Sequence, residues 1–301
     1  MKKILIAGGT GLIGTHLSRL LKNSGYEVAH LSRRANPNAE FPTYAWQPEA
    51  GTYDKKAFDE ADAIINLAGA GIADKLWSEK RKREIIDSRT SGNQLIAKYL
   101  RSEKHHVEAY ISASAIGFYA DRGDEIMTET ATAGTGFLAE STVAWERAIA
   151  EVAATNVRTV ALRIGVVLSP EGGALQKMLI SFMFRMGVYF GNGRQWTSWI
   201  HRDDLCNIFL FALQNPNING TFNAVAPTPL SNFDLTKAIS TAKGGVYLML
   251  PTPSFALRLA MGELADVVLG STRVSSQKIE NQGFVFRFPE ALMALKNLFS
   301  S

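Results

Sequence analysis

The sequence predicts an α/β protein with a doubly wound, mostly parallel sheet and a smaller, interleaved C-terminal lobe. From residue 1 to about 167, short apolar runs alternate with segments of helical periodicity, as in parallel βαβ units. The first apolar run ends in a glycine-rich turn that leads into a helix. Beyond residue 167, glycines and prolines divide the chain into shorter pieces. We therefore expect a core at 1–167 and a second lobe at 168–301.

The elements of the core follow from these runs in order. Strands are expected at 3–7, 27–31, 62–67, 107–112 and 157–163, with a weaker one at 41–46. Amphipathic segments predict helices over 12–21, 78–101 and 137–154. A helix at 203–213 and a strand at 220–224 are expected to return to the core, so the lobe interleaves with it at about 200–226. The apolar segment 251–270 has helical spacing and is interpreted as core rather than membrane surface.

The glycine-rich turn has the spacing of a dinucleotide-binding site in a Rossmann-type fold. Gly8 allows a tight turn, Gly11 lets backbone N–H groups approach a pyrophosphate, and Gly14 lets the helix pack closely on the strand. The helix N-terminus adds free N–H groups and the positive end of its dipole. The residues expected to hold the dinucleotide here are Gly8, Thr10, Gly11, Leu12, Ile13 and Gly14.

The end of the second strand selects the type of dinucleotide. An acidic residue at this point would accept a hydrogen bond from the 2′-OH of NAD. The chain instead has Ser32, Arg33 and Arg34, which are donors suited to a 2′-phosphate. The sequence therefore favours NADP(H) over NAD(H).

Composition excludes several other classes of protein. With 301 residues, of which 46% are hydrophobic, the chain can bury a large core. The net charge of +4 is mild, and the basic run at 80–83 is interpreted as a solvated helix face, so nucleic-acid binding is not indicated. Cys206 stands alone, and no long apolar segment or signal-peptide pattern is present. We expect a cytoplasmic protein that neither spans a membrane nor binds a metal.

Polar or small residues follow three further strands, where ligands of such sheets lie. Asn66-Leu-Ala-Gly69 ends one strand in small residues, as close passage of a cofactor requires, although a simple turn would look the same. Ser112-Ala-Ser-Ala115, with Tyr119, places hydroxyls near the expected nicotinamide. Arg163 ends a third strand with a charge that the interior would not tolerate unpaired.

Taken in order, these segments resemble a known superfamily. The motifs are Gly8-Gly-Thr-Gly-Leu-Ile-Gly14, Asn66-Leu-Ala-Gly69, Ser112-Ala-Ser-Ala115, Leu162-Arg-Ile-Gly165 and Trp199-Ile-His-Arg-Asp-Asp204. They are similar to those of extended and atypical short-chain dehydrogenases/reductases (SDRs), specifically the nucleoside-diphosphate-sugar-epimerase-like branch. The resemblance covers almost the whole chain, including a piece of the substrate lobe at 271–288. It implies a Rossmann fold that binds NADP(H).

The resemblance also implies cofactor contacts at particular residues. These are Ser32, Arg33, Leu67, Ala68, Glu84, Arg89 and Arg163. We also expect Gly69 to contact the cofactor, because it is a small residue in the same loop as Leu67 and Ala68. Glu84 and Arg89 lie on the helix after that loop and could reach the ribose or phosphates. An exposed salt bridge between the two is the alternative.

The catalytic pair of that superfamily, Tyr-x-x-x-Lys, is missing. None of the eight tyrosines has a lysine four residues later, and Phe137 stands where the pair should begin. Without the lysine, a phenol of ordinary pKa near ~10 is a poor acid or base at neutral pH. The remaining candidates are Ser114 to orient a carbonyl, Tyr119 as a relocated donor, Glu140 if burial raises its pKa, and His201. For His201 a structural role is favoured, with Asp203 or Asp204 as a helix cap.

A substrate rim is expected beside a flexible turn at 191–193. Its members are Gln195, Trp196, Trp199 and His201, together with Arg194. Aromatic faces beside an amide and a guanidinium suit a sugar ring or a planar base. Aromatic packing beneath a loop is the alternative.

The sequence leaves three functional hypotheses. The first is an NADP(H)-dependent oxidoreductase or epimerase acting on a small polar molecule, with a nucleotide-linked sugar as a candidate substrate. The second is an NADP-binding sensor or scaffold with little or no turnover. The third, with the least support, is a nucleic-acid-associated relative. A monomer or a homodimer is expected.

Overall fold

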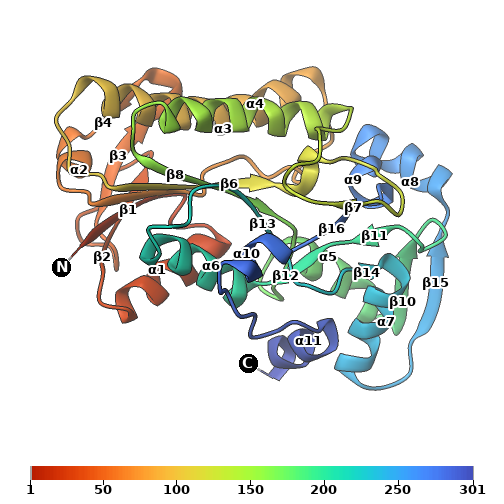
Figure 1. Ribbon diagram of the computed structural model, residues 1–301. Coiled ribbons are helices and arrows are strands. Elements are labelled where there is room, and N and C mark those ends of the chain that lie inside the picture. The colour runs from red at the N-terminus through yellow and green to blue at the C-terminus, as the bar shows by residue number, and fades with distance from the viewer. Residues whose placement is uncertain (1, 301) are drawn as a thin grey trace.

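The computed structural model describes residues 2–300 and is organised around one eight-stranded sheet (Figure 1). The strand order is β13-β8-β6-β5-β1-β2-β3-β4, and every neighbouring pair is parallel except β3 with β4. The strands are β1 (Lys3–Ala7), β2 (Glu27–Ser32), β3 (Thr43–Gln47), β4 (Thr52–Tyr53), β5 (Ala63–Asn66), β6 (Ala109–Ala115), β8 (Arg158–Ile164) and β13 (Gly220–Ala224). The predicted α/β class and Rossmann-type sheet are therefore confirmed.

Helices cover both faces of this sheet. Figure 1 shows α3 and α4 side by side on one face, and α1 and α6 together on the other. These core helices are α1 (Leu12–Asn23), α2 (Lys55–Asp59), α3 (Glu79–Ser102), α4 (Phe137–Ala153) and α6 (Arg202–Gln214). Since successive side chains of a strand point to opposite faces, each central strand contributes to two apolar layers.

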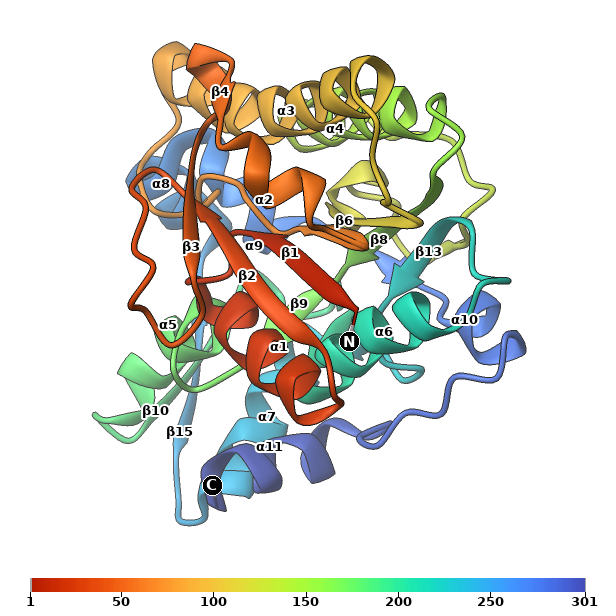
Figure 2. The same ribbon diagram turned by 90° about the vertical axis from the view of Figure 1, so that its left-hand side faces the viewer.

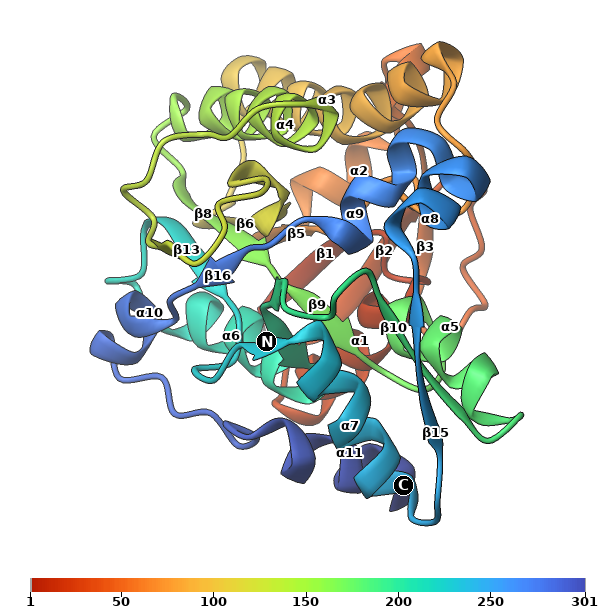
Figure 3. The same cartoon turned by 90° about the vertical axis from the view of Figure 1, so that its right-hand side faces the viewer.

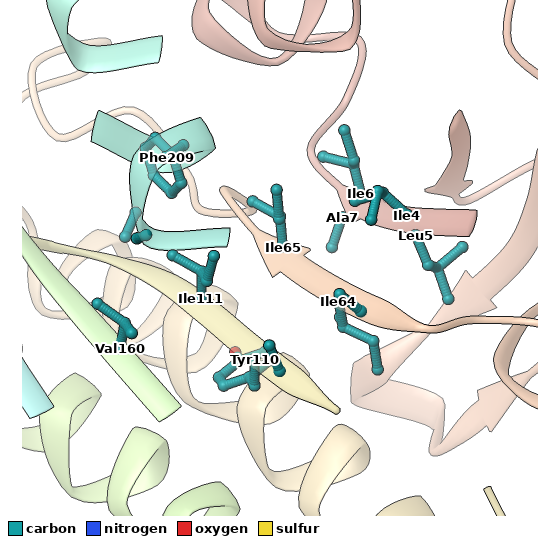
Figure 4. Close-up of a cluster of buried hydrophobic side chains, with 14 of the residues drawn as sticks. Ile4, Leu5, Ile6, Ala7, Ile64, Ile65, Tyr110, Ile111, Val160 and Phe209 are labelled. Atoms are coloured by element: carbon teal, nitrogen blue, oxygen red, sulfur yellow. The ribbon is translucent and has the colours of Figure 1, made fainter. Parts of the chain in front are cut away.

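The core lies in these two layers (Figure 4). Ile65 and Ile111 point toward the side of Phe209 on α6, whereas Ile64 and Tyr110 point the other way. All five side chains are fully buried. Each such burial stabilises the fold by about 1.5–3 kcal/mol relative to exposure. The apolar runs of the sequence thus become the buried centre of a two-faced sheet.

The rest of the chain forms the lobe beside the carboxyl ends of the strands. Its short strands pair as β12–β9, β11–β14, β16–β7 and β10–β15, and Figure 3 shows β10 and β15 side by side. The elements are β7 (Ile126–Met127), β9 (Val166–Leu168), α5 (Gly173–Phe182), β10 (Met186–Phe190), β11 (Trp196–Thr197), β12 (Trp199–His201), β14 (Leu230–Ser231), α7 (Asn232–Lys243), β15 (Leu248–Thr252), α8 (Ser254–Met261), α9 (Asp266–Leu269), β16 (Arg273–Val274), α10 (Gln277–Asn281) and α11 (Ala291–Ser300). Three 3₁₀ segments complete the described elements: η1 (Pro48–Ala50), η2 (Ile116–Phe118) and η3 (Gly262–Ala265).

The C-terminal segment crosses back under the core before it ends. Figure 2 shows α11 against α7, at the far side from β4. The Asp204 carboxylate at the start of α6 anchors this segment, because it accepts hydrogen bonds from the backbone N–H groups of Arg287 at 3.0 Å and Phe288 at 2.9 Å. Strand β13 and helix α6 lie in the core although they follow residue 167. The functional division at residue 167 stays a prediction.

The interpretation of 251–270 as core is correct for one side only. Leu257, Leu264 and Ala265 are buried, but Phe255 is 74% exposed and Leu259 is 88% exposed on α8. The helical spacing is real, yet the described part of the protein packs against only one side of α8. Separately, the helices within residues 2–300 include none with the length and apolar character needed to cross a membrane.

Candidate functional site

The glycine turn between β1 and α1 touches the loop after β5. Gly8 has φ +79°, and a Cβ atom there would lie 2.8 Å from the carbonyl carbon of Leu67. A Cβ on Gly14 would lie 2.2 Å from the carbonyl oxygen of Gly8. Both distances are far inside van der Waals contact, so only glycine allows the turn, the helix and the neighbouring loop to approach this closely.

Gly9 is a further required glycine that the sequence reasoning did not single out. A Cβ atom on Gly9 would lie 2.3 Å from the Cδ2 atom of His30. The buried His30 ring is held by Ser18, whose Oγ lies 2.8 Å from its Nε2 and donates to the Gly14 carbonyl at 2.7 Å. Burial lowers the pKa of His30, which favours the neutral ring. A histidine in a strand gives no sequence signal that its ring will lie under the turn.

The N-terminus of α1 is open to an anion. Gly11 is its N-cap and makes no side-chain capping bond, and the first turn holds no acidic residue. Thr10 and Gly11 are exposed, while Leu12 and Ile13 are half-buried. Backbone N–H groups and the helix dipole therefore face a place where a phosphate can bind without competition from a side chain of the same turn.

Strand β2 brings its basic end beside this turn. β1 and β2 pair so that Ala7 lies opposite Leu31, which puts Ser32, Arg33 and Arg34 just past the glycines. Ser32 is half-buried, and both arginines are exposed. Neither arginine forms an ion pair with any of residues 2–300. Their guanidinium groups are therefore free to meet a phosphate.

The loop after β5 is held in a fixed shape. The Asn66 amide donates to the Tyr110 hydroxyl at 3.0 Å and accepts from the backbone N–H of Ala68 at 3.0 Å. Tyr110 in turn donates to Asn93 on α3. Leu67 and Ala68 are half-buried and Gly69 is exposed, so this loop forms a wall next to the glycine turn. The interpretation of Asn66–Gly69 as more than a simple turn fits this geometry.

Arg89 does not pair with Glu84. Glu84 instead bonds Arg81 at 3.2 Å, whereas Arg89 donates to the carbonyl oxygens of Ala70 and Ile85 at 3.0 and 3.1 Å. Burial, with a smaller effect of Arg81, lowers the pKa of Arg89 to about 10. No carboxylate within residues 2–300 lies in salt-bridge range of this guanidinium, so the expected alternative of a surface salt bridge is wrong. A partly buried cation that lacks a counter-ion is suited to a phosphate or ribose.

A compact polar cluster joins the ends of β6 and β8 to α4. Ser114 on β6 donates from Oγ to Glu146 Oε1 at 2.7 Å, and Arg163 on β8 binds both Glu146 oxygens at 2.7 Å. The Arg163 guanidinium also lies 3.5 Å from the centre of the Phe118 ring. Burial alone would lower the pKa of Arg163, but the bonds to Glu146 outweigh it and raise the value. The expected partner of the interior arginine is thus Glu146, which the sequence reasoning did not identify.

Tyr119 belongs to the same cluster but not to an open site. It is fully buried, donates to Asn223 Oδ1 at 2.7 Å and accepts from Arg163 at 3.0 Å. Burial raises the pKa of its phenol against the opposing effect of Arg163. Because its proton is already committed and its hydroxyl is enclosed, the role of relocated proton donor is corrected to that of a support for Arg163.

One further acid or base candidate also changes. Glu140 is exposed on α4, so the burial on which its role depended is absent. Phe137, which stands where the missing pair should begin, packs its ring 4.7 Å from that of Trp77. Ser114 remains a candidate at the end of β6, where its hydroxyl is 2% exposed and bonded to Glu146.

The predicted rim is not brought together as a rim. Trp199 and His201 are fully buried, and the Trp199 indole donates to the Thr228 carbonyl at 2.8 Å. Gln195 donates to the carbonyl oxygens of Phe190 and Val268, and the Trp196 indole donates to Asp124 at 2.7 Å. The alternative of packing beneath a loop is therefore correct for Trp199. Trp196 remains half-buried and accessible.

His201 caps helix α6 itself. Its Nδ1 accepts from the backbone N–H of Asp203 at 3.0 Å, and its ring stacks on Phe288 at 3.9 Å. Its expected structural role is confirmed, but the expected cap at Asp203 or Asp204 is wrong. Asp203 lies in the first turn and Asp204 holds the C-terminal segment.

Helix α5 begins over the glycine turn. Its N-cap, Gly172, lies so close to Leu12 that a Cβ atom would be 3.2 Å from a Leu12 methyl carbon. Glu171 just before it contacts His16 on α1 at 2.7 Å and Arg202 on α6 at 2.6 Å. Gly172 and Gly173 therefore begin a helix. Across the described residues, no cluster of histidine, cysteine or acidic side chains could hold a metal ion.

The arrangement is shared with known proteins. A family model described as the NAD dependent epimerase/dehydratase family matches residues 4–224, and one described as a domain of unknown function (DUF1731) matches residues 252–298. The chain is 37% identical over 286 residues to epimerase family protein MT2273 of Mycobacterium tuberculosis, covering 94% of this chain and 93% of that protein. It is 30% identical to human epimerase family protein SDR39U1 (isoform 2), crystallised with NADPH, with a TM-score of 0.91 and 99% of both chains covered.

A second solved structure extends the comparison. The nucleoside-diphosphate sugar epimerase of Corynebacterium glutamicum is 34% identical to this chain, with a TM-score of 0.80. The match covers 99% of this chain and 58% of that one. The similarity therefore includes both the sheet and the C-terminal lobe described above.

Proposed function

The chain belongs to the NAD dependent epimerase/dehydratase family, and we propose that it binds NADP(H) and acts as an oxidoreductase or epimerase on a small polar molecule. The human relative solved with NADPH supports the choice of cofactor. When bound, the cofactor supplies a carbon centre that can give or accept a hydride. The protein must then bind it, orient it and handle the proton of the substrate.

One observation carries the proposal: an open helix N-terminus lies next to two exposed, unpaired arginines. Gly11 leaves the first turn of α1 uncapped, while Arg33 and Arg34 follow the neighbouring strand. A pyrophosphate at the helix and a 2′-phosphate at the arginines would satisfy both groups. Arg89, which lacks a carboxylate partner among the described residues, would face the ribose or phosphates between them.

We propose that fifteen residues contact the cofactor. They are Gly8, Thr10, Gly11, Leu12, Ile13, Gly14, Ser32, Arg33, Arg34, Leu67, Ala68, Gly69, Glu84, Arg89 and Arg163. Ser114, at the carboxyl end of β6 and itself 2% exposed, is the proposed hydroxyl nearest the substrate. The sugar epimerase of Corynebacterium glutamicum makes a nucleotide-linked sugar a reasonable first substrate to test.

The proposal is tested by titrating the purified protein into NADPH and NADH while nicotinamide fluorescence is recorded. We expect NADPH emission to change at low protein concentration and NADH emission to change far less. Equal affinity for the two would contradict the role given to Arg33. Metabolites retained with the NADPH-bound protein would then identify the substrate by mass spectrometry.

A second function, an NADP-binding sensor or scaffold, is favoured by the state of the candidate proton donors. The chain lacks Tyr-x-x-x-Lys, the Tyr119 proton is bound to Asn223, and the Ser114 proton is bound to Glu146. A protein with this site could hold the cofactor without rapid turnover. Tight NADPH binding together with no oxidation of NADPH by any retained metabolite would support this second function.

A further inference from the structure

The most unusual feature of the site is a buried ion pair on the helix that should carry the missing tyrosine and lysine. The Glu146 side chain is 16% exposed and that of Arg163 is 5% exposed. Two hydrogen bonds of 2.7 Å link them in a bidentate arrangement. The same Glu146 oxygen that accepts from Arg163 Nε also accepts from Ser114. One carboxylate thus serves both polar groups at these strand ends.

The strand order says which end of the cofactor would meet this cluster. Figure 3 shows β8, β6, β5, β1 and β2 in sequence across the sheet. If the pyrophosphate lies at α1 and the adenosine phosphate at the end of β2, the other half of the dinucleotide must extend toward β5, β6 and β8. Ser114 is two strands from β1, about 10 Å at the usual ~4.8 Å spacing. The nicotinamide would therefore lie near Ser114, with Arg163 one strand further.

The charge of Arg163 would affect the two forms of the cofactor differently, because the nicotinamide ring is positive in NADP⁺ and neutral in NADPH. A partly enclosed guanidinium near this ring would repel the oxidised form and leave the reduced form unaffected. Glu146 cancels that charge at a distance of one hydrogen bond. Glu146 also accepts the hydrogen bond that Ser114 donates, so the Ser114 hydroxyl, which is 2% exposed, has only its lone pairs left for a ligand.

We propose that Glu146 is a positioning residue that neutralises Arg163 and fixes Ser114 as a hydrogen-bond acceptor, so that the site can hold NADP⁺ as well as NADPH. This inference rests on the proposed binding of NADP(H). It assigns to α4 an electrostatic role in place of the absent tyrosine and lysine. It also implies that Ser114 recognises a hydroxyl or amide donor rather than a carbonyl oxygen.

The test compares the dissociation constants of NADP⁺ and NADPH by calorimetry in the full-length protein. Glu146→Gln should raise the ratio of the NADP⁺ constant to the NADPH constant about tenfold, as expected for one uncancelled charge several ångströms away. Glu146→Asp should raise it less, because the charge remains. Glu151→Gln, on the same helix in a weaker pair with Arg101 at 3.9 Å, is the matched control and should leave the ratio unchanged.

A double variant separates charge from folding. Glu146→Gln with Arg163→Gln removes both buried charges, so the ratio should return toward the wild-type value even if both affinities fall. A purely structural role for Glu146 predicts equal losses for the two cofactor forms in the single variant, and that result would overturn the inference. If the wild-type protein binds neither form, the proposed function itself fails instead.

Discussion

The Nζ atom of Lys177 on α5 donates a hydrogen bond of 2.8 Å to the carbonyl oxygen of Ala73, in the loop between β5 and α3. Helix α5 starts beside Leu12, on the α1 side of the sheet, whereas Ala73 leads into α3 on the other side. The bond therefore joins elements from the two sides of the sheet, and one of its ends lies in the loop that follows the carboxyl end of β5. That is the place at which we propose that the dinucleotide binds.

Loss of this bond should speed release of the cofactor. Lys177→Met keeps most of the aliphatic length but cannot donate, so we expect NADPH to dissociate about three- to tenfold faster, in line with the net value of one ordinary hydrogen bond at an exposed position. Stopped-flow displacement measures this rate. Lys237→Met, at an exposed position of α7, is the control. An unchanged dissociation rate would mean that the bond does not limit escape.

Arg33→Ala should weaken NADPH binding much more than NADH binding. The exposed Arg33 guanidinium has no ion-pair partner among the described residues, and only NADPH carries the 2′-phosphate that it would bind. We expect a loss of about ten- to a hundredfold for NADPH, as for a lost charge-assisted hydrogen bond. Fluorescence titration of both cofactors gives the values, with Arg147→Ala on α4 as control. Similar losses for NADPH and NADH would refute the assignment.

Substitutions at two glycines of the turn should have different effects, one on cofactor binding and the other on the free energy of unfolding. A Cβ at Gly11 has its nearest neighbour at 3.3 Å and an extended φ of −76°, so Gly11→Val should fold but block approach of a pyrophosphate. Gly14→Ala instead forces a Cβ against the backbone of Gly8, and should lower the free energy of unfolding by about 1–3 kcal/mol. Thermal unfolding and cofactor titration distinguish the two effects. Retained binding in Gly11→Val would place the site elsewhere.

The stability of the protein should fall as the pH is lowered toward 4. Burial, partly offset by Asp203, lowers the pKa of His201 to about 4, from an ordinary value near ~6.5. Between about pH 6.5 and pH 4, His201 binds a proton in the unfolded chain but not in the folded protein. The free energy of unfolding that is present above about pH 6.5 is therefore lost progressively as the pH falls toward 4. A shift of this size corresponds to a contribution of about 3 kcal/mol.

Urea unfolding across this pH range measures the effect. His201→Asn keeps an N-capping acceptor for Asp203 but cannot titrate, so its unfolding free energy should depend less on pH than that of the wild type. His106→Asn, at an exposed position, is the control and should keep the wild-type slope. Equal slopes for the His201 variant and the wild type would show that another group dominates.

Much of the fold was predictable because its signals are local. The apolar runs around Ile4, Ile64 and Ile111 became strands, and the glycines between β1 and α1 fixed the turn. The tryptophans and His201 were harder, because a sequence such as Trp199-Ile-His201 does not say which face of a strand will be covered. Here both faces were covered, so Trp199 and His201, which were expected at a rim, are buried instead.

The candidate site also has a part that the sequence predicted and a part that only the tertiary structure decided. Sequence alone determined the strand, turn and helix that can hold a phosphate and the basic end of β2, since each depends on residues within a few positions of one another. Tertiary structure decided that Arg89 has no carboxylate partner in the described residues, and that Ser114 and Arg163 share Glu146 across 32 and 17 residues of chain. Such pairings depend on which helices and strands pack against one another, and the periodicity of residues along the chain does not predict this packing.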